Sequence, residues 1–439
     1  MTPRAAVAAA AAALLGATAA VAHGAAPWSA PVTLSPGAAS MPGGPSVAVS
    51  PEGRAVVTWW RRAAGASAGA VQMSLRAAPG AAFIGPQDLS GGMPAPVATA
   101  AAAAAGSHVA TGWADRRQVR VRVLRAAGAA GTTAVIREGA ALLADVSVGT
   151  DGAGGVVAVW TRDPLPAGPA GGDVRVRMAV MVPGVGWSPA VDASAEGATR
   201  PALAVAPDGN ALVAWSRGGA IEVARRSPGA ALVFPPAVVS SPDAGFARVP
   251  AVAIGPDGEG LVAWYQRGLM AADLPAGRGS GPATVLSAPA GLPTGTRPTD
   301  PPPRIALGAG GRAVVAWARA HAGSRRVEAA VRPAGAAWQP AAVLSARRAG
   351  APALGSDGAG GAVVAWTQET GAPRSALRAR ALARSATQFA QLELVVPGAR
   401  RASRPAMGLD AAGRAVLAWR EQPARGRPLV RAAVRLPAG

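Results

Sequence analysis

The sequence contains neither cysteine nor lysine, and its 439 residues include three histidines and one tyrosine. Without cysteine, the chain cannot form disulfides, a thiolate metal site or a cysteine nucleophile. The histidines, His23, His108 and His321, are scattered along the chain, which argues against a histidine metal cluster or a Ser-His-Asp triad. We therefore expect no metal and no cofactor.

Aromatic residues are also scarce, at 4%, but 12 of the 17 are tryptophan. Such selective use of one large side chain predicts that it occupies repeated structural positions.

The charge is strongly basic. The formal net charge is +20 and all the basic residues are arginine. The high content of Ala, Gly, Pro and Arg is typical of a GC-rich genome, so composition explains part of this charge. A surface this basic nevertheless attracts anions.

The N-terminal residues 1–22 have the pattern of a secretory signal peptide. Arg4 precedes an apolar, alanine-rich stretch that ends in Ala20-Val21-Ala22, an A-x-A cleavage site. The alternative is a membrane anchor, which usually needs about 20 apolar residues with more Leu or Ile. We expect a secreted or extracytoplasmic monomer without a transmembrane segment after cleavage.

One pattern recurs along residues 23–439: an apolar run, a glycine turn and a second apolar run that ends in tryptophan. The best copy runs from Pro201 through Pro207-Asp208-Gly209 to Trp215. Successive copies are 47 to 55 residues apart, and a weaker one ends at Trp113. The repeated tryptophans are Trp59, Trp113, Trp160, Trp215, Trp264, Trp317, Trp366 and Trp419.

The apolar runs are short, β-branched and bounded by Gly, Pro and Asp, which predicts strands joined by tight hairpins. A third strand, such as Val119 to Val123, and often a fourth, such as Trp187 to Val191, complete each unit. Four-stranded units of this length are typical of β-propeller blades.

We therefore predict an all-β, eight-bladed propeller, with seven blades as the alternative if the Trp113 unit is lost. An orphan fourth strand at 28–35 is expected to complete the last blade, which removes the free sheet edges. The predicted blades are 41–90, 91–138, 143–193, 199–240, 248–287, 302–345, 350–397, and 403–438 with 28–35.

The repeated Pro-Asp-Gly and Val-Ala-Trp elements resemble those of secreted bacterial propellers of the sialidase-like type. No Asp-box is intact, and the nearest match, from Ser241 through Asp243 and Gly245, has Phe246 and lacks the tryptophan. The resemblance implies a candidate activity on acidic sugars. It would require a tyrosine activated by a glutamate, for which Tyr265, Glu222 and Glu259 are the candidates, and arginines on the substrate carboxylate.

Arginine follows the tryptophan within four residues in seven of the eight units, whereas the Trp366 unit has Thr-Gln-Glu369. In a propeller, the loops between second and third strands share one face with the loops between blades. We predict a discontinuous ring of guanidinium groups on that face, suited to carboxylate, sulfate or phosphate. The alternative is that these arginines are solvated strand ends. The predicted ligand-binding residues are Arg61, Arg62, Arg116, Arg117, Arg162, Arg217, Arg267, Arg319 and Arg420.

The repeated tryptophans are expected to pack between blades rather than bind sugar, and Asp208, Asp257, Asp357 and Asp410 to shape turns. Three functions remain open. The first is non-catalytic binding of an anionic polysaccharide, wall polymer or envelope protein through the arginine face. The others are a glycosidase or lyase acting on acidic sugars, and a structural envelope scaffold. Nucleic acid is disfavoured because the aromatics needed for base stacking are committed to packing.

Overall fold

The computed structural model describes most of the chain after residue 26, and the predicted signal peptide lies outside the described residues. The described segments are 27–35, 40–63, 68–90, 93–94, 101–105, 108–115, 117–124, 131, 133–139, 141–164, 173–230, 236–241, 245–277, 279–288, 301–321, 324–371 and 373–436.

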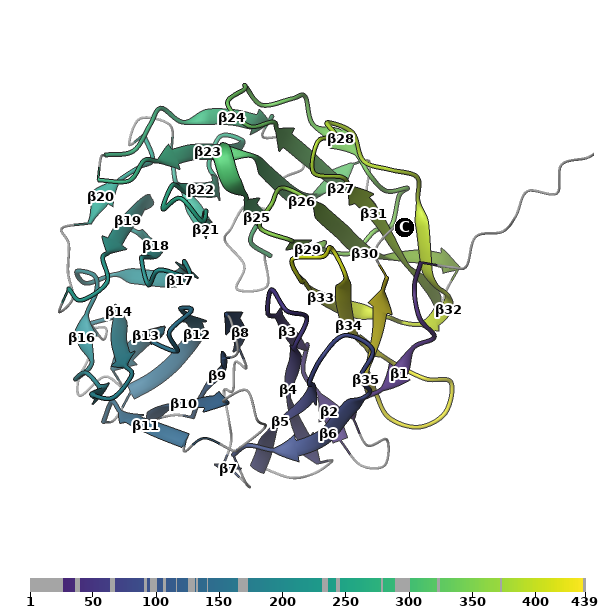
Figure 1. The fold of residues 1–439 in the computed structure, drawn as a ribbon, viewed down its shortest axis with the longest axis horizontal. Helices are drawn as coiled ribbons and strands as arrows, with labels where there is room; N and C mark the ends of the chain where they lie inside the picture. The colour runs from purple at the N-terminus through teal and green to yellow at the C-terminus, as the bar shows by residue number, and fades with distance from the viewer. Residues whose placement is uncertain are drawn as a thin grey trace, which may run out of the picture.

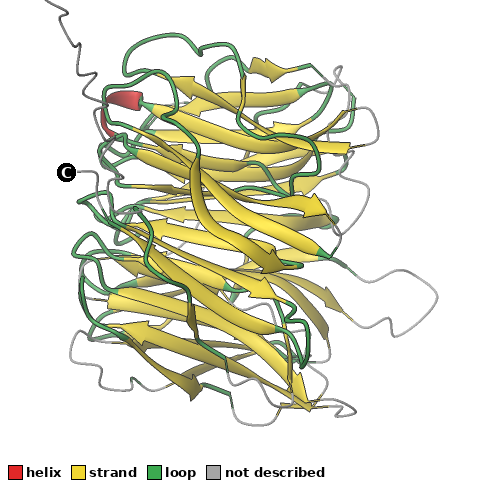
Figure 2. Cartoon of the chain, turned by 90° about the vertical axis from the view of Figure 1, so that its right-hand side faces the viewer, coloured by secondary structure: helices red, strands yellow, loops and turns green. Residues whose placement is uncertain are grey.

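These residues form eight antiparallel sheets arranged in a ring (Figure 1). The first strands of successive sheets contact one another in a closed circle, from β3 through β33 and back to β3. The prediction of an eight-bladed propeller is therefore confirmed, including the uncertain second blade. Figure 2 shows the strands of successive blades stacked around the ring, with the loops gathered at its two edges.

Blades 1 and 3 carry additional short strands, and the other blades have four strands each. Blade 1 contains β2 (Ser40–Pro42), β3 (Ser46–Val49), β4 (Ala55–Ala63), β5 (Ala68–Arg76), β6 (Phe83–Asp88) and β7 (Met93–Pro94). Blade 2 contains β8 (Ala101–Ala105), β9 (His108–Ala114), β10 (Gln118–Leu124) and β11 (Thr133–Arg137). Blade 3 contains β12 (Ala141–Thr150), β13 (Val156–Pro164), β14 (Arg175–Val182), β15 (Gly186–Trp187) and β16 (Val191–Asp192). Blade 4 contains β17 (Ala198–Val205), β18 (Ala211–Arg217), β19 (Ala220–Arg226) and β20 (Ala237–Val238).

The second half of the ring follows the same plan, with one short 3-10 turn, η2 (Ala309–Gly311), in its described part. Blade 5 contains β21 (Arg248–Ile254), β22 (Gly260–Tyr265), β23 (Leu269–Leu274) and β24 (Thr284–Ser287). Blade 6 contains β25 (Arg304–Leu307), β26 (Ala313–His321), β27 (Ser324–Arg332) and β28 (Ala342–Val343). Blade 7 contains β29 (Ala353–Ser356), β30 (Ala362–Gly371), β31 (Arg374–Leu382) and β32 (Glu393–Arg400). Blade 8 contains β33 (Ser403–Leu409), β34 (Ala415–Glu421), β35 (Leu429–Arg435) and the N-terminal β1 (Val32–Thr33).

The N-terminal strand closes the ring, as predicted. Val32 lies opposite Ala432 in an antiparallel ladder, and Leu34 N–H donates to the Val430 carbonyl at 2.9 Å. Because β1 takes the outer position of blade 8, it covers an edge of β35 that would otherwise be unpaired.

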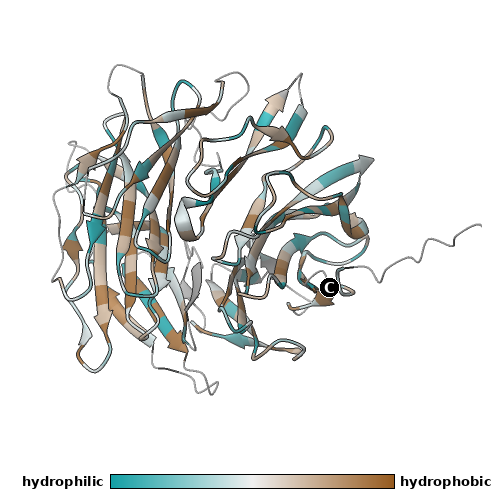
Figure 3. Cartoon of the chain, turned by 45° about the horizontal axis from the view of Figure 1, so that its top comes forward, coloured by the Kyte–Doolittle hydropathy of each residue, from teal (hydrophilic) through white to brown (hydrophobic). Residues whose placement is uncertain are grey.

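The hydrophobic core lies between neighbouring blades. All eight repeated tryptophans are 0% exposed, which confirms that they are packing residues. Trp215, for example, packs with Val157 and Val159 of the preceding blade. The apolar side chains of each second strand thus bury the faces of two sheets at once, and Figure 3 shows hydrophobic residues concentrated along the strands.

The glycine six residues before the tryptophan explains the hairpin between first and second strands. Seven of these glycines have φ between 75° and 98°, a region that other residues adopt at a cost. The neighbouring aspartates shape the same turns, since Asp357 Oδ1 accepts from the Ala359 and Gly361 N–H groups. The conformational role predicted for the turn carboxylates is confirmed there.

Within the described residues, no helix is long and apolar enough to cross a membrane.

Candidate functional site

Four arginines of the predicted discontinuous ring lie next to carboxylates in the described structure. Arg61, Arg162, Arg217 and Arg319 leave the second strands of their blades beside a carboxylate. Arg162 Nε lies 3.1 Å from Glu138, Arg319 Nη1 lies 3.5 Å from Glu328, and Arg61 Nη2 lies 3.4 Å from Asp88. Arg217 pairs with Glu222. Each guanidinium therefore already has an anionic partner.

Two of these carboxylates also hold a core tryptophan. The Trp215 indole N–H donates to Glu222 Oε2 at 2.6 Å, and the Trp317 indole N–H donates to Glu328 Oε2 at 3.1 Å. The arginine in each pair neutralises a carboxylate that satisfies a buried donor, which is a structural task.

The remaining predicted arginines are spread over several blades. Arg62, Arg117 and Arg267 are exposed in blade 1, blade 2 and blade 5. Arg116 lies outside the described residues. Arg420, in β34, lines a pocket.

The structure does not bring the three candidate catalytic residues together. Tyr265 ends β22 and Glu259 immediately precedes the same strand, so they are six positions apart, about 20 Å along the extended chain. Tyr265 is 2% exposed within an apolar cluster. Glu222 is in the neighbouring blade and is engaged by Trp215 and Arg217. Within the described chain, no group of three or more His, Asp or Glu side chains could hold a metal ion.

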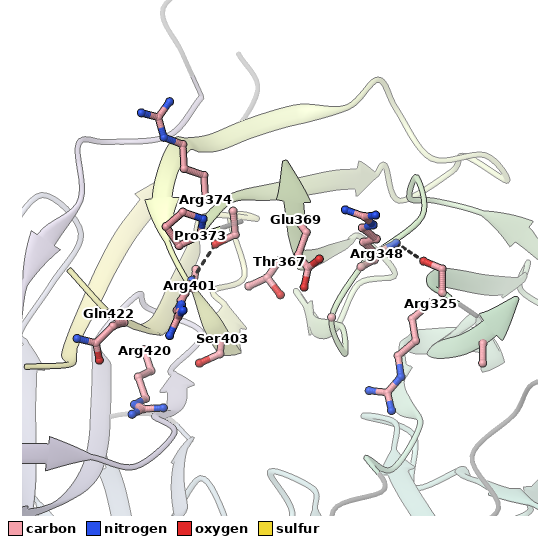
Figure 4. Close-up of a pocket in the computed structure, with 16 residues that line it drawn as sticks. Arg325, Arg348, Thr367, Glu369, Pro373, Arg374, Arg401, Ser403, Arg420 and Gln422 are labelled. Atoms are coloured by element: carbon pink, nitrogen blue, oxygen red, sulfur yellow. Dashed lines mark hydrogen bonds between the residues drawn. The ribbon is translucent and has the colours of Figure 1, made fainter. Parts of the chain in front are cut away.

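An open pocket of about 1020 Å³ lies over blades 6, 7 and 8, on the face that carries the loops between second and third strands (Figure 4). Its lining contains five arginines and one carboxylate, with no aromatic side chain. The charged residues are Arg325, Arg348, Arg374, Arg401, Arg420 and Glu369. A second hollow of about 300 Å³ shares Pro373, Arg401 and Gln422 with it, so the depression continues beyond the main pocket.

Two similar segments at the entries to blades 7 and 8 contribute residues to the lining of this pocket. Arg347-Arg348-Ala349 precedes blade 7, and Arg400-Arg401-Ala402 precedes blade 8. Arg348 and Arg401 both have a left-handed backbone, with φ of 61° and 43°. Strained backbone of this kind persists only where its surroundings hold it, and it is enriched at functional sites.

Hydrogen bonds hold both strained residues in place. Arg348 N–H donates to Ser324 Oγ at 2.7 Å, and its carbonyl accepts from Glu369 N–H at 3.1 Å. Arg401 N–H donates to the Pro373 carbonyl at 3.1 Å. The loops of one blade thus fix the entry to the next.

The pocket carries uncompensated positive charge. The five pocket arginines form no ion pair within the described residues, whereas Arg61, Arg162, Arg217 and Arg319 each lie beside a carboxylate. Burial, with a smaller contribution from the charge of Arg404, lowers the pKa of Arg420 from its usual range. Arg420 Nε is buried without a hydrogen-bond partner among the described residues. A bound anion would relieve the repulsion among these positive charges.

A second cavity of about 460 Å³ lies among the first strands of blades 3 to 7, toward the centre of the ring. It is lined by Asp145, Arg200 and Arg304 together with several prolines. Asp145 and Arg200 have left-handed φ and lie at irregularities in the first-strand pairing. Arg304 Nε donates to the Pro352 carbonyl at 3.3 Å.

No family model matches the chain, and no curated protein matches it in sequence. Among solved structures, the chain is similar to the leech intramolecular trans-sialidase complexed with 2,7-anhydro-Neu5Ac, at 10% identity and a TM-score of 0.41, covering 89% of each chain. It is similar to the NanB sialidase of Streptococcus pneumoniae at 6% identity and a TM-score of 0.42, covering 93% of this chain and 97% of that one. An ulvan lyase gives 10% identity and a TM-score of 0.48, covering 75% of this chain and 90% of the lyase. The sequence predicted a sialidase-like propeller, and sialidases are among these neighbours.

Proposed function

We propose that this chain is a non-catalytic binding propeller that takes an anionic polysaccharide in the pocket over blades 6 to 8. The observation that carries the proposal is the set of five arginines without ion pairs in the described structure, gathered around a single carboxylate. Guanidinium groups without internal partners suit ligands that carry carboxylate or sulfate groups.

The other lining residues favour a polysaccharide over a protein or a nucleic acid. Ser324, Thr367, Ser403 and Gln422 provide neutral hydrogen-bonding groups for hydroxyls. The lining lacks the aromatic anchors that dominate protein interfaces and that stack bases in single strands. The continuation of the pocket past Arg401 suits an extended chain. The signal peptide predicted at residues 1–22 supports an extracytoplasmic location.

The proposal is tested by salt-dependent retention on immobilised hyaluronan and polygalacturonate. Arg325→Gln with Arg420→Gln removes two pocket charges from regular strand positions, so the strained backbone is untouched. The matched control is Arg62→Gln with Arg267→Gln, which removes two exposed charges from other blades. We expect the pocket variant to bind at least tenfold more weakly and the control less than twofold, because only the pocket charges contact the ligand.

Equal losses in the two variants would show that overall charge, rather than the pocket, retains the polymer. Failure of the unmodified protein to bind either polymer at low salt would overturn the proposal. Release of new reducing ends or unsaturated uronate during incubation would overturn its non-catalytic part. Thermal unfolding of both variants verifies that they are folded.

A further inference from the structure

Glu369 is the carboxylate at the middle of the pocket. It lies near the end of β30 in blade 7, where the other seven units carry an arginine after the tryptophan. Its side chain is exposed, and within the described residues it forms no ion pair with the surrounding arginines. It is therefore available to a ligand.

The order of the blades places positive charge on both sides of Glu369. Arg325 comes from blade 6 and Arg348 from the segment that enters blade 7. Arg401 enters blade 8 and Arg420 lies within it, and Arg374, which begins β31 of blade 7, lies on the same side of Glu369 as Arg401 in Figure 4. Figure 4 shows the same order, with Glu369 between the two groups of arginines.

This order of charges constrains a ligand that spans the pocket. An anionic group next to Arg325 and Arg348, or next to Arg401 and Arg420, is attracted. An anionic group placed at Glu369 is repelled, whereas a hydroxyl there donates a hydrogen bond to the carboxylate. The ligand that fits all three positions is charged at its two ends and neutral between them.

We propose that Glu369 is a specificity residue that selects polysaccharides whose charged sugars are separated by uncharged ones. The inference rests on the proposed function, because it assumes that an anionic polysaccharide occupies this pocket. It extends that function by specifying how the charged groups of the ligand are spaced and which side chain discriminates between different spacings.

The test compares hyaluronan, in which every second sugar carries a carboxylate, with polygalacturonate, in which every sugar does. Fragments of equal length are titrated against the unmodified protein, Glu369→Gln and Glu52→Gln. Glu52 is an exposed glutamate in the turn between β3 and β4, on the opposite edge of the ring, so its variant changes net charge equally.

We expect the unmodified protein to prefer hyaluronan fragments. Glu369→Gln should improve polygalacturonate binding by about four- to tenfold, because a repulsion at a few ångströms is removed, and improve hyaluronan binding much less. The affinity ratio should be unchanged in Glu52→Gln.

The outcomes separate the two proposals. Binding of both polymers with the same affinity ratio in the unmodified protein and in Glu369→Gln would overturn the selective role of Glu369 and leave the proposed function standing. An equal shift in Glu52→Gln would also overturn it, because net charge would then account for the change. Absence of binding to either polymer would overturn both.

Discussion

Arg217 and Glu222 form an ion pair within blade 4 in which the guanidinium Nε donates to Glu222 Oε1 at 2.8 Å. The other carboxylate oxygen accepts the indole N–H of buried Trp215. The pair lies at the edge of the core, since 39% of the Arg217 side chain but 4% of the Glu222 side chain is exposed. Arg217 was predicted from the sequence as a ligand-binding residue, and in the structure it stabilises the packing of its own blade.

Replacing Glu222 should therefore lower the free energy of unfolding, and the loss should be larger when the substitution leaves the Trp215 indole N–H without an acceptor. Glu222→Gln retains an acceptor for Trp215 and should lower the free energy of unfolding by about 1 kcal/mol. Glu222→Ala leaves a buried indole N–H without an acceptor and opens space, so about 2 to 3 kcal/mol is expected. Urea denaturation measures both. Equal losses would show that the hydrogen bond to Trp215 contributes nothing.

The closure of the ring gives a second prediction, centred on Trp28. Its side chain is 6% exposed, and its indole N–H donates to Glu393 at 2.7 Å, a residue that Arg435 also engages. Trp28→Ala should cost about 3 to 5 kcal/mol, because it removes a large buried side chain and one of the links between the chain ends.

Val32→Ala is the control for Trp28→Ala, since Val32 lies on the same segment but is 45% exposed. Thermal unfolding and limited proteolysis near the N-terminus should respond to Trp28→Ala and hardly to the control. A Trp28→Ala protein that unfolds at the same temperature as the unmodified chain would show that closure is not stabilised through this residue.

The fold could be predicted from the sequence because its determinants are local and repeated. A buried tryptophan and a glycine at positive φ recur at fixed spacing in nearly every blade. Each copy of the pattern therefore supports the prediction that the other copies form blades. The end strand at 28–35 was identifiable because the last unit lacked a fourth strand.

The site could not be predicted in the same way, because it depends on which side chains meet across strands and blades. Glu222 lies opposite Trp215 in the ladder, which is what places it beside Arg217. Arg348 and Arg401 become pocket residues through a left-handed backbone that arginine rarely adopts. The available signals were the Arg-Arg-Ala segments at 347–349 and 400–402 and the absence of arginine after Trp366.

The turn glycines give a third prediction, from a matched pair. Gly258 has φ of 79° and nothing near the position a Cβ would take. Gly258→Ala should therefore lower the free energy of unfolding by about 1 to 2 kcal/mol, which is the cost of placing a Cβ on a left-handed backbone. Gly360 has φ of 98°, and a Cβ there would lie 2.4 Å from Arg312 Cδ, so Gly360→Ala should cost more.

Arg312 explains why that clash is not easily relieved. It is 6% exposed, and its Nε donates to the Gly360 carbonyl at 2.9 Å. Denaturation midpoints of the two variants test the order. A Gly258→Ala loss as large as that of Gly360→Ala would show that contact with Arg312 adds nothing.

The last prediction concerns the pH dependence of stability at Glu138, which is 7% exposed between Arg162 and Arg177. Burial raises the pKa of the Glu138 carboxyl, and this effect outweighs the two arginines, which lower it. The folded protein therefore holds this proton to a higher pH than the unfolded chain does. In the pH range that begins near the ordinary glutamate pKa of about 4.3, the folded state binds more protons at this group than the unfolded chain does. The contribution of Glu138 to the free energy of unfolding therefore falls as the pH rises.

Glu138→Gln removes that contribution, so the stability of the unmodified protein relative to the variant should decline as pH is raised from about 4 to 7. Denaturant titrations of both proteins across this range measure the difference. Asp88→Asn, at a more exposed carboxylate beside Arg61, is the control for the loss of one negative charge. If the unmodified protein instead gains stability relative to Glu138→Gln as pH rises, the two arginines outweigh burial, and Glu138 is charged in the fold at lower pH than in the unfolded chain.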